Sequence, residues 1–471
     1  MSTPVIPPDP QPPVGTSPLT GTFVPPPPAS GKRWSVGTLT YTSGGLFALF
    51  ALLLLGDFSW SMRDRSVGPM AQWYLKDLKV PNFLFALLIS SFPALVGLIL
   101  SPIISVKSDR HRGPRGRRIP FLLVTTPIAA ASMIGLALTP LIATWVHSLM
   151  PDASEMVVAV VCFGVFWAAF EFATIAASSV FGGLINDVVP KELLGRFYGL
   201  FRAVSLIDGI IFNFWLFGKV ETHYTIILLV IGTFYGASFY WVCLKVKEGS
   251  YPPPTAHQST RPFAGVATYF RECFSRPYYI GVFVMMTIAS LVFMPVNIFM
   301  IPYAGSLGMG MDYYGKCMAL TFTISLVLAY PLGWLCDIFH PLRISMICLL
   351  GYAAVTAWGA FHARDPQTFA IALVLHGVLS GCYYTASASL GQRLYPHFRF
   401  AQFASAAGIV GSFGGMTIGP LVGGVIDLTG NAYHHTFTIG CVVAILALVL
   451  SFAVHAQFMR LGGPKGYIAP E

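Results

Sequence analysis

Apolar residues recur along this chain in runs long enough for a helix to cross a lipid bilayer. A spanning helix needs about 20 mostly apolar residues. Runs of about that size lie at residues 38–62, 81–106, 119–143, 156–186, 197–218 and 224–244, and, after a polar interval, at 278–303, 313–336, 343–361, 368–392, 401–427 and 435–458. Buried helices of soluble proteins seldom come in such a series. The pattern predicts an all-α integral membrane protein with twelve transmembrane helices.

The polar interval divides the runs into two sets of six. We expect a disordered proline-rich tail at 1–36, a six-helix bundle at 37–245, a cytoplasmic linker at 246–276, a second six-helix bundle at 277–458 and a short tail at 459–471. The first tail lacks the apolar segment of a signal peptide. It is expected to be solvated, with a role as a proline-rich ligand as the alternative.

Composition supports the membrane prediction. The chain is 55% hydrophobic and 10% charged, whereas a soluble domain carries roughly 25% charged residues. The eight cysteines are scattered, mostly inside apolar runs, and form neither a CxxC pair nor a Cys/His cluster. We therefore expect no metal site, no disulfide framework and no cofactor.

The net charge of +9 raises the question of a nucleic-acid partner, but the basic residues form no continuous face. They lie in short loops, above all in "ISVKSDRHRGPRGRRIPFLL" at 104–123. With the N-terminus inside, inner segments hold 20 Lys and Arg and outer segments hold 7, leaving Arg202 within a helix. Because cytoplasmic loops are enriched in these residues, both termini are predicted to be cytoplasmic, and nucleic acid is not expected as a partner.

The two halves carry similar inner loops. "SDRHRGPRGRR" follows the second run and "GWLCDIFHPLR" follows the eighth; "VPKELLGRFYG" follows the fourth and "YPHFRFAQFAS" follows the tenth. Two related six-helix bundles joined by an inner linker are a plan typical of secondary transporters.

The first pair of loops resembles the helix 2–3 signature of the major facilitator superfamily, roughly G-x-x-x-D-x-x-G-R-R. The matching residues are Asp109, Gly116, Arg117 and Arg118 in the first half and Gly333, Asp337 and Arg343 in the second. The resemblance implies the major facilitator fold and a cytoplasmic gate at these residues. A carboxylate at a helix end can pair with arginines and with a helix N-terminus when such a gate closes. An ordinary basic inner loop is the alternative.

A narrower resemblance covers the first four helices. "GDFSWSMRDRSVGPMAQWYLKDL" at 56–78 and "FGVFWAAFEF" at 163–172 look like the sucrose/maltose–proton symporters and, more distantly, the glycoside–pentoside–hexuronide cation symporters. The resemblance implies a sugar or glycoside as the solute and a proton or sodium ion as its partner. One departure is Gly182, which stands where the sucrose-type family carries an arginine that helps to hold sugar.

Acidic residues at membrane depth are candidates for coupling. Glu171 lies about 15 residues, or roughly 22 Å, into its helix, where a carboxylate costs at least ~2.5 kcal/mol. We expect Glu171 to carry the coupled proton; a structural pair with Arg202 or another cation is the alternative. Asp57 is a second proton or cation candidate. If the first helix continues to about Trp73, Arg63 to Arg65 also lie at membrane depth or at a cavity mouth; if it ends near Ser61, they are outer-loop charges.

Several other polar residues in the helices offer hydrogen bonds or ring faces to a solute. The substrate-cavity candidates are Arg63, Asp64, Asp208, Asn297, His376, Tyr383, Tyr384 and Gln392. For Asn297, His376, Tyr383, Tyr384 and Gln392, helix packing is the alternative role.

The sequence thus predicts a secondary active transporter of the cytoplasmic membrane, a monomer that moves a sugar or glycoside with a proton by alternating access. Transport of a non-sugar solute, coupled to protons or sodium, is one alternative. A membrane assembly or pigment-handling protein on the same fold is another. No HExxH pair, GxSxG elbow or phosphate-binding Gly-Lys loop occurs, so an enzyme is not expected.

Overall fold

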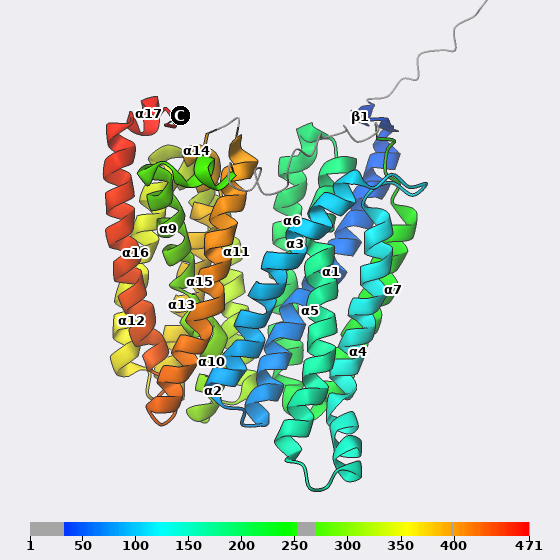
Figure 1. Ribbon diagram of the computed structural model, residues 1–471, viewed down its shortest axis with the longest axis vertical. Helices are drawn as coiled ribbons and strands as arrows, with labels where there is room; N and C mark the ends of the chain where they lie inside the picture. The colour runs from blue at the N-terminus through cyan, green and yellow to red at the C-terminus, as the bar shows by residue number, and fades with distance from the viewer. Residues whose placement is uncertain (1–32, 252–268, 397–398, 471) are drawn as a thin grey trace, which may run out of the picture.

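The computed structural model describes residues 33–251, 269–396 and 399–470, and most of them are helical. Most of the predicted tail at 1–36 and the middle of the predicted linker at 246–276 lie outside these residues. The described chain begins and ends at the same end of the molecule, which we call the terminal end (Figure 1). We call the opposite end the far end.

The first half of the chain forms one helical bundle after a short hairpin. Its elements are β1 (Trp34–Val36), β2 (Leu39–Tyr41), α1 (Ser43–Asp77), α2 (Asn82–Ala86), the π-helical turn η1 (Leu87–Ser91), α3 (Phe92–Arg110), α4 (Ile119–Leu149), α5 (Glu155–Val188), η2 (Lys191–Leu193), α6 (Leu194–Ile211), η3 (Phe212–Leu216), η4 (Phe217–Lys219) and α7 (Val220–Lys245). We refer to α1–α7 as the first bundle.

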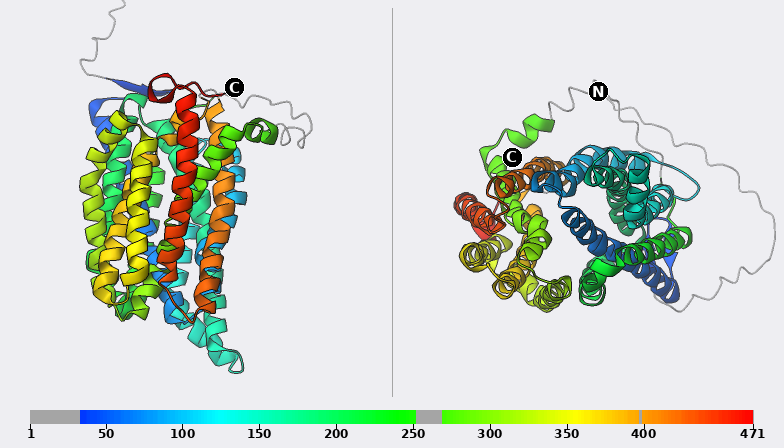
Figure 2. Two further views of the ribbon diagram at one scale, coloured as in Figure 1. Left: turned by 90° about the vertical axis from the view of Figure 1, so that its left-hand side faces the viewer. Right: turned by 90° about the horizontal axis from the view of Figure 1, so that it is seen from below.

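The second half repeats the plan. Its elements are α9 (Pro277–Leu291), α10 (Met294–Ser306), α11 (Met311–Phe339), α12 (Pro341–His362), α13 (Pro366–Ser387), α14 (Leu390–Leu394), α15 (Phe400–Leu428), α16 (His435–Arg460) and α17 (Gly463–Gly466). We refer to α9–α16 as the second bundle. Viewed from the far end, the two bundles lie side by side (Figure 2).

The prediction of twelve membrane crossings agrees with these elements. Within the described residues, eleven helical segments are long and apolar enough to span a bilayer. One of them, Lys191–Lys245, has 55 residues, about twice the length that a crossing needs. It holds both α6 and α7, and at His223 the backbone leaves helical geometry, with φ −128° and ψ 23°. The chain is therefore a multi-pass membrane protein.

The start of the chain differs from the prediction. Residues 34–41 were expected to belong to the disordered tail and the first helix, but they form the hairpin of β1 and β2, in which Trp34 pairs with Tyr41. Gly37 supports the turn because its φ of +53° suits a residue without a Cβ. Thr42 then begins α1, since its side chain accepts a hydrogen bond from the Gly45 amide at 3.2 Å.

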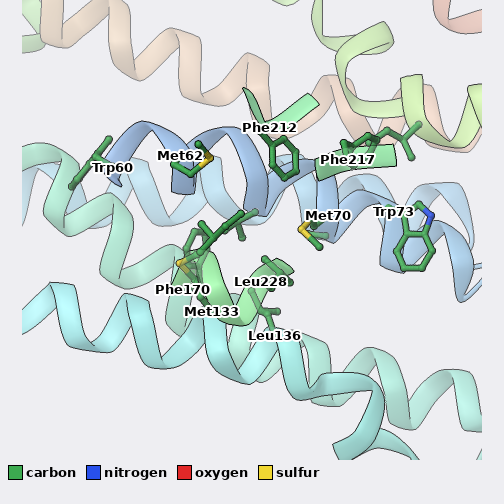
Figure 3. Packing of buried hydrophobic residues seen from close by; sticks show 14 of the residues in the cluster. Trp60, Met62, Met70, Trp73, Met133, Leu136, Phe170, Phe212, Phe217 and Leu228 are labelled. Carbon is green, nitrogen blue, oxygen red and sulfur yellow. The ribbon is translucent and has the colours of Figure 1, made fainter. Parts of the chain in front are cut away.

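Helix α1 contributes to the core of the first bundle. It packs against α6 and α7, and its large apolar side chains lie near those of neighbouring elements (Figure 3). Those labelled in Figure 3 are Trp60, Met62, Met70 and Trp73 of α1, Met133 and Leu136 of α4, Phe170 of α5, Phe212 and Phe217 beyond α6, and Leu228 of α7. Since α1 runs unbroken to Asp77, residues 63–65 lie inside the helix rather than in an outer loop.

At the terminal end, arginines of the signature loop join three helices of the first bundle. Arg117 Nε donates to Asp187 Oδ2 at 2.8 Å, and Arg118 Nε donates to the same oxygen at 3.2 Å. Arg118 also binds Asp109 and Ser108. The ends of α3, α4 and α5 are thereby connected, and all of these pairs lie within one bundle.

A carboxylate from the segment after α7 completes this cluster. Glu248 accepts hydrogen bonds from the backbone amides of Arg117 (2.9 Å), Arg118 (2.8 Å) and Ile119 (2.7 Å), at the N-terminus of α4. Gly116 has a φ of +97°, and a Cβ there would lie 2.5 Å from the Glu248 side chain. Both facts explain why this position of the signature holds glycine.

The corresponding residues of the second bundle are arranged differently. Asp337 accepts a hydrogen bond from Arg393 Nη2 at 3.0 Å. Arg343 instead donates to His455 Nε2 at 3.3 Å. A Cβ added at Gly333 would meet no atom within 4 Å. The helix-end carboxylate is thus paired with an arginine of α14, not with the arginine of the motif.

We predict that Glu248→Ala lowers the free energy of unfolding by about 1 kcal/mol, because three amides at the start of α4 lose their acceptor. Glu248→Gln, which keeps an acceptor oxygen without the charge, should be intermediate. Thermal unfolding of the purified full chain measures both. Glu192→Ala, at an exposed glutamate of the same end, is the control and should change little. An unfolding temperature equal to that of the native chain in Glu248→Ala would contradict the capping role.

Candidate functional site

A cavity of about 370 Å³ lies between the two bundles. We call it the central cavity. Residues of both bundles line it, and its wall is partly polar. The lining residues are Asp64, Arg65, Pro69, Arg202, Leu206 and Asn213 from the first bundle, and Asn297, Met300, Tyr314, Met318, Thr321, Phe322, Ser325, Gly377, Ser380, Gly381 and Tyr384 from the second. A mixed wall of this kind is typical of a small-molecule site.

Hydrogen bonds between the bundles close the cavity at the far end. Asp427, near the end of α15, accepts from the Asn82 amide (3.0 Å) and the Phe83 amide (2.8 Å) at the N-terminus of α2. The Asn82 side chain donates to Asp427 (2.8 Å) and Asn431 (2.7 Å) and accepts from the Tyr433 hydroxyl (2.9 Å). The carboxylate therefore caps a helix of the other bundle.

The far half also brings backbones close together at glycines. A Cβ at Gly315 of α11 would lie 2.3 Å from the Asn213 carbonyl oxygen, and one at Gly423 of α15 would lie 2.5 Å from the Asn82 carbonyl oxygen. Nearer the middle, Ser90 donates to the Gly415 carbonyl oxygen at 3.0 Å. Side chains larger than hydrogen at the two glycines would push the bundles apart.

The terminal half of the interface has no such contacts among the described residues. The hydrogen bonds given above between described residues of the two bundles lie in the middle or at the far end. Glycines on α6, α11 and α15 toward the terminal end have open space where a Cβ would stand. They are Gly195, Gly199, Gly333, Gly408 and Gly411. The hydrogen bonds between the bundles thus lie on the far side of the central cavity, and the described residues show none on its terminal side.

Behind the cavity wall, α1 carries a buried arginine. Arg63 is 1% exposed, and it donates to Asp64 Oδ1 from Nε (3.1 Å) and Nη2 (2.5 Å) and to the Tyr235 hydroxyl from Nη1 (3.0 Å). Its guanidinium carbon lies 3.9 Å from the centroid of the Trp60 ring. Arg63 was expected to line the cavity, but of this pair only Asp64, 53% exposed, does so.

None of the coupling candidates lines the cavity, and Glu171 lies near Arg63. Glu171 of α5 is within electrostatic range of Arg63 and Asp64. Asp57 of α1 and Asp208 of α6 are buried, and within electrostatic range of one another. Asp57 Oδ2 and both carboxylate oxygens of Asp208 have no hydrogen-bond partner among the described residues. Asp208 therefore belongs with the buried acids rather than with the cavity wall.

In the second bundle, a hydrogen-bonded chain leads from the cavity into the core. His376 Nε2 lies 2.9 Å from Asn297 Oδ1, and His376 Nδ1 lies 2.7 Å from the Tyr352 hydroxyl. Tyr352 is fully buried, and among the described residues this nitrogen is the one acceptor for its O–H. The His376 Nε2–H then donates to Asn297, which leaves the amide N–H groups of Asn297 for the cavity. His376 itself, 2% exposed, does not line the cavity.

The remaining cavity candidates separate in the same way. Tyr384 lines the cavity, and its hydroxyl donates to the Ser290 carbonyl oxygen at 3.4 Å. Tyr383 is buried against Phe293, with ring centroids 5.2 Å apart. Gln392 lies on α14 near the terminal end and is exposed, but it does not line the cavity. On α13, Tyr384 therefore lines the cavity, whereas its neighbour Tyr383 packs in the core.

Two groups of residues were not among the cavity candidates of the sequence analysis. Arg65 and Arg202 line the cavity; Arg65 was expected at a cavity mouth only if the first helix reached about Trp73, as it does, and Arg202 was considered only as a possible partner of Glu171. Asp427 and Asn82 close the far end, although neither was considered. Asp427 could have been noticed in the sequence, because it is an acid in the last turn of a glycine-rich helix. Which helix N-terminus it caps depends on packing, which the sequence does not show.

Comparisons with known proteins agree with this architecture. Residues 282–458, most of the second bundle, match the family model of the Major Facilitator Superfamily. A mutant of the nucleoside transporter NupG superposes with a TM-score of 0.63 at 13% identity, covering 87% of this chain and 100% of that one. The fold is that of the major facilitator superfamily.

Two further structures share the major facilitator fold of this chain. A bacterial homologue of the human lysosomal transporter Spinster, in an inward-facing and occupied conformation, has a TM-score of 0.63 at 13% identity, covering 91% of this chain and 99% of that one. A D-xylose–proton symporter has a TM-score of 0.62 at 13% identity, covering 86% and 97%. The search of curated proteins found no match. These likenesses establish the fold and leave the solute open.

We predict that Asp427→Ala opens the far end of the cavity. Loss of a helix cap costs about 1 kcal/mol, which corresponds to roughly a fivefold shift between two conformations. Spin labels at residues 152 and 367, on exposed positions of the two bundles at the far end, should show a longer or a second distance.

Asp77→Ala is the matched control, since Asp77 is an exposed aspartate at the same end for which the structure shows no hydrogen bond to the second bundle. The control should keep the native distance. The closing role of Asp427 is wrong if both variants give the native distribution.

Proposed function

We propose that this protein is a secondary transporter that works by alternating access, with the central cavity as its solute site. The observation that carries the proposal is a cavity lined by both bundles and closed at one end by hydrogen bonds between them. Opening the far end while the bundles approach at the terminal end would expose the same site to the other side. One chain supplies the whole wall, so a monomer suffices.

The terminal end is the cytoplasmic end in this proposal. Its support is the distribution of Lys and Arg, which places 20 of these residues in inner segments against 7 in outer ones. The membrane is then the cytoplasmic membrane, both termini lie inside, and the structure is the inward-open state of the transporter.

We predict that a cysteine at residue 152, in the exposed loop between α4 and α5, reacts with a membrane-impermeant maleimide in intact cells. A cysteine at residue 247, after α7, should react only in permeabilised cells. The native chain controls for labelling of its own cysteines. The reverse labelling pattern would overturn the orientation.

The proposed solute is a sugar or glycoside, and the proposed coupling ion is a proton. The resemblance of residues 56–78 and 163–172 to sugar–cation symporters supports the solute class, and the D-xylose–proton symporter shares the fold. Gly182, where the sucrose-type family has an arginine, does not line the central cavity. The sugar contacts of that family therefore do not transfer residue by residue, and Asn297, Ser380 and Tyr384 of the second bundle are our candidates for hydroxyl recognition.

Glu171 and Asp57 are the proposed proton carriers. Both lie at membrane depth, where a charged carboxylate is costly, and Glu171 lies within electrostatic range of the Arg63–Asp64 pair that reaches the cavity. Protonation of Glu171 would change the balance of charge around Arg63, and through Asp64 this change reaches the solute site. Downhill proton entry could in this way drive uptake.

We predict that Glu171→Gln abolishes concentrative uptake, with a loss of tenfold or more, in proteoliposomes with an inward proton gradient; general acid–base groups commonly contribute about 10² or more. Solute-dependent proton movement, with sucrose, maltose or D-xylose as probes, should disappear as well. Exchange of solute without a gradient should persist.

Glu155→Gln, at an exposed glutamate in the first turn of the same helix, is the control and should transport normally. Full accumulation by Glu171→Gln would remove Glu171 from the coupling mechanism. If solute movement depends on a sodium gradient and not on the proton gradient, sodium is the coupling ion instead of the proton.

A further inference from the structure

The first bundle places two arginines on the wall of the central cavity. Arg65 is held at the seam between the bundles: its Nε donates to the Ser205 carbonyl oxygen (3.2 Å) and its Nη2 to Ser205 Oγ (2.9 Å). Its guanidinium carbon lies 4.8 Å from the ring centroid of Phe322 on α11. The structure shows no protein partner for Nη1 among the described residues, so this donor remains for a ligand.

Arg202 stands on α6, close to Arg65. It lines the same cavity and is exposed there. Within the described residues it makes no hydrogen bond and no ion pair, and its charge repels that of Arg65. Two like charges on one cavity wall repel each other, and a charge at membrane depth is costly unless it is paired or faces a wet cavity. Such an arrangement needs an explanation in terms of what enters the cavity.

Among the described residues no acid forms an ion pair with Arg65 or Arg202, although Asp64 and Asp208 lie within electrostatic range of Arg65. Asp64, which also lines the cavity, is engaged by two nitrogens of Arg63 (3.1 Å and 2.5 Å). Asp208 lies within electrostatic range of Arg65, but it is fully buried behind the wall. The lining residues of the second bundle are all uncharged. The wall therefore carries two arginines against one aspartate that already has a partner.

We propose that Arg65 and Arg202 bind a carboxylate of the solute, so that the transported molecule is an acidic sugar or glycoside rather than a neutral one. The planar forks of arginine fit a carboxylate through two parallel hydrogen bonds. The hydroxyl groups of the same solute would face Asn297, Ser380 and Tyr384 across the cavity. This inference rests on the proposed function and narrows its solute class.

The test compares matched pairs of probes on the purified full chain. D-glucuronate is paired with D-glucose, and methyl β-D-glucuronide with methyl β-D-glucoside, at equal ionic strength. The acidic member of a pair should raise the unfolding temperature in a concentration-dependent way, and the neutral member should do so far less. Arg202→Gln should weaken the binding of the acid by about tenfold or more, the usual effect of losing a charged hydrogen bond.

Variants locate the effect. Among the described residues Arg202 makes no hydrogen bond or ion pair that a substitution would remove, so Arg202→Gln should fold normally. Arg202→Lys should retain part of the binding because it keeps the charge. Arg65→Gln tests the second arginine. Arg196→Gln is the matched control, because Arg196 is an exposed arginine of α6 that does not line the cavity; it should bind the acid normally.

Each contrary outcome has a separate meaning. If neutral and acidic members bind equally, or only the neutral ones bind, the carboxylate inference is wrong while the sugar proposal stands. If no member of either pair stabilises the protein, the acidic-sugar inference and the sugar proposal both fail. If the acid binds but neither arginine variant weakens it, the assignment to Arg65 and Arg202 is wrong.

Discussion

A charged side chain inside the hydrocarbon layer must find a partner, a cavity or a function, and this requirement organises the first bundle. Helix α1 carries Asp57, Arg63, Asp64 and Arg65 within its 35 residues. No lipid-facing position could hold them at acceptable cost. The charged part of the helix is consequently placed against protein or cavity, with Arg63 enclosed by Trp60 and Tyr235 and with Asp64 and Arg65 on the wall of the central cavity. The cavity borders this part of α1 because the charged side chains there need a polar surrounding.

The protein uses one electrostatic device at both of its ends. A carboxylate accepts hydrogen bonds from backbone amides at a helix N-terminus, which favours negative charge. At the terminal end, Glu248 caps α4 of the bundle to which it is joined. At the far end, Asp427 of the second bundle caps α2 of the first. The first contact can persist when the bundles move, whereas the second must break for the far end to open.

The signature residues that resemble the major facilitator superfamily have a structural explanation in the first half. Gly116 combines a positive φ with the close approach of Glu248, and Arg117 and Arg118 share Asp187. In the second half the resemblance is looser, because Asp337 binds Arg393 and Arg343 binds His455. In the present conformation these groups hold the helices of each bundle together. If these residues also close the cytoplasmic gate, the signature loops of the two bundles, or the helix surfaces beside them, must come into contact across the interface.

The sequence by itself determined the membrane class, the twelve crossings and the division into two bundles, because apolar runs of bilayer length and the repeated inner loops are local properties of the chain. It also identified Glu171 and Asp57 as costly carboxylates, since their depth follows from helix length alone. Only the tertiary structure decided which polar residues face the cavity. His376 and Tyr383 lie behind the wall and Arg65 and Arg202 lie on it, because neighbouring positions of a helix point in different directions and the packing angle selects among them. The contact of Asp427 with Asn82 joins residues 345 positions apart, and no local pattern records a pairing over that separation.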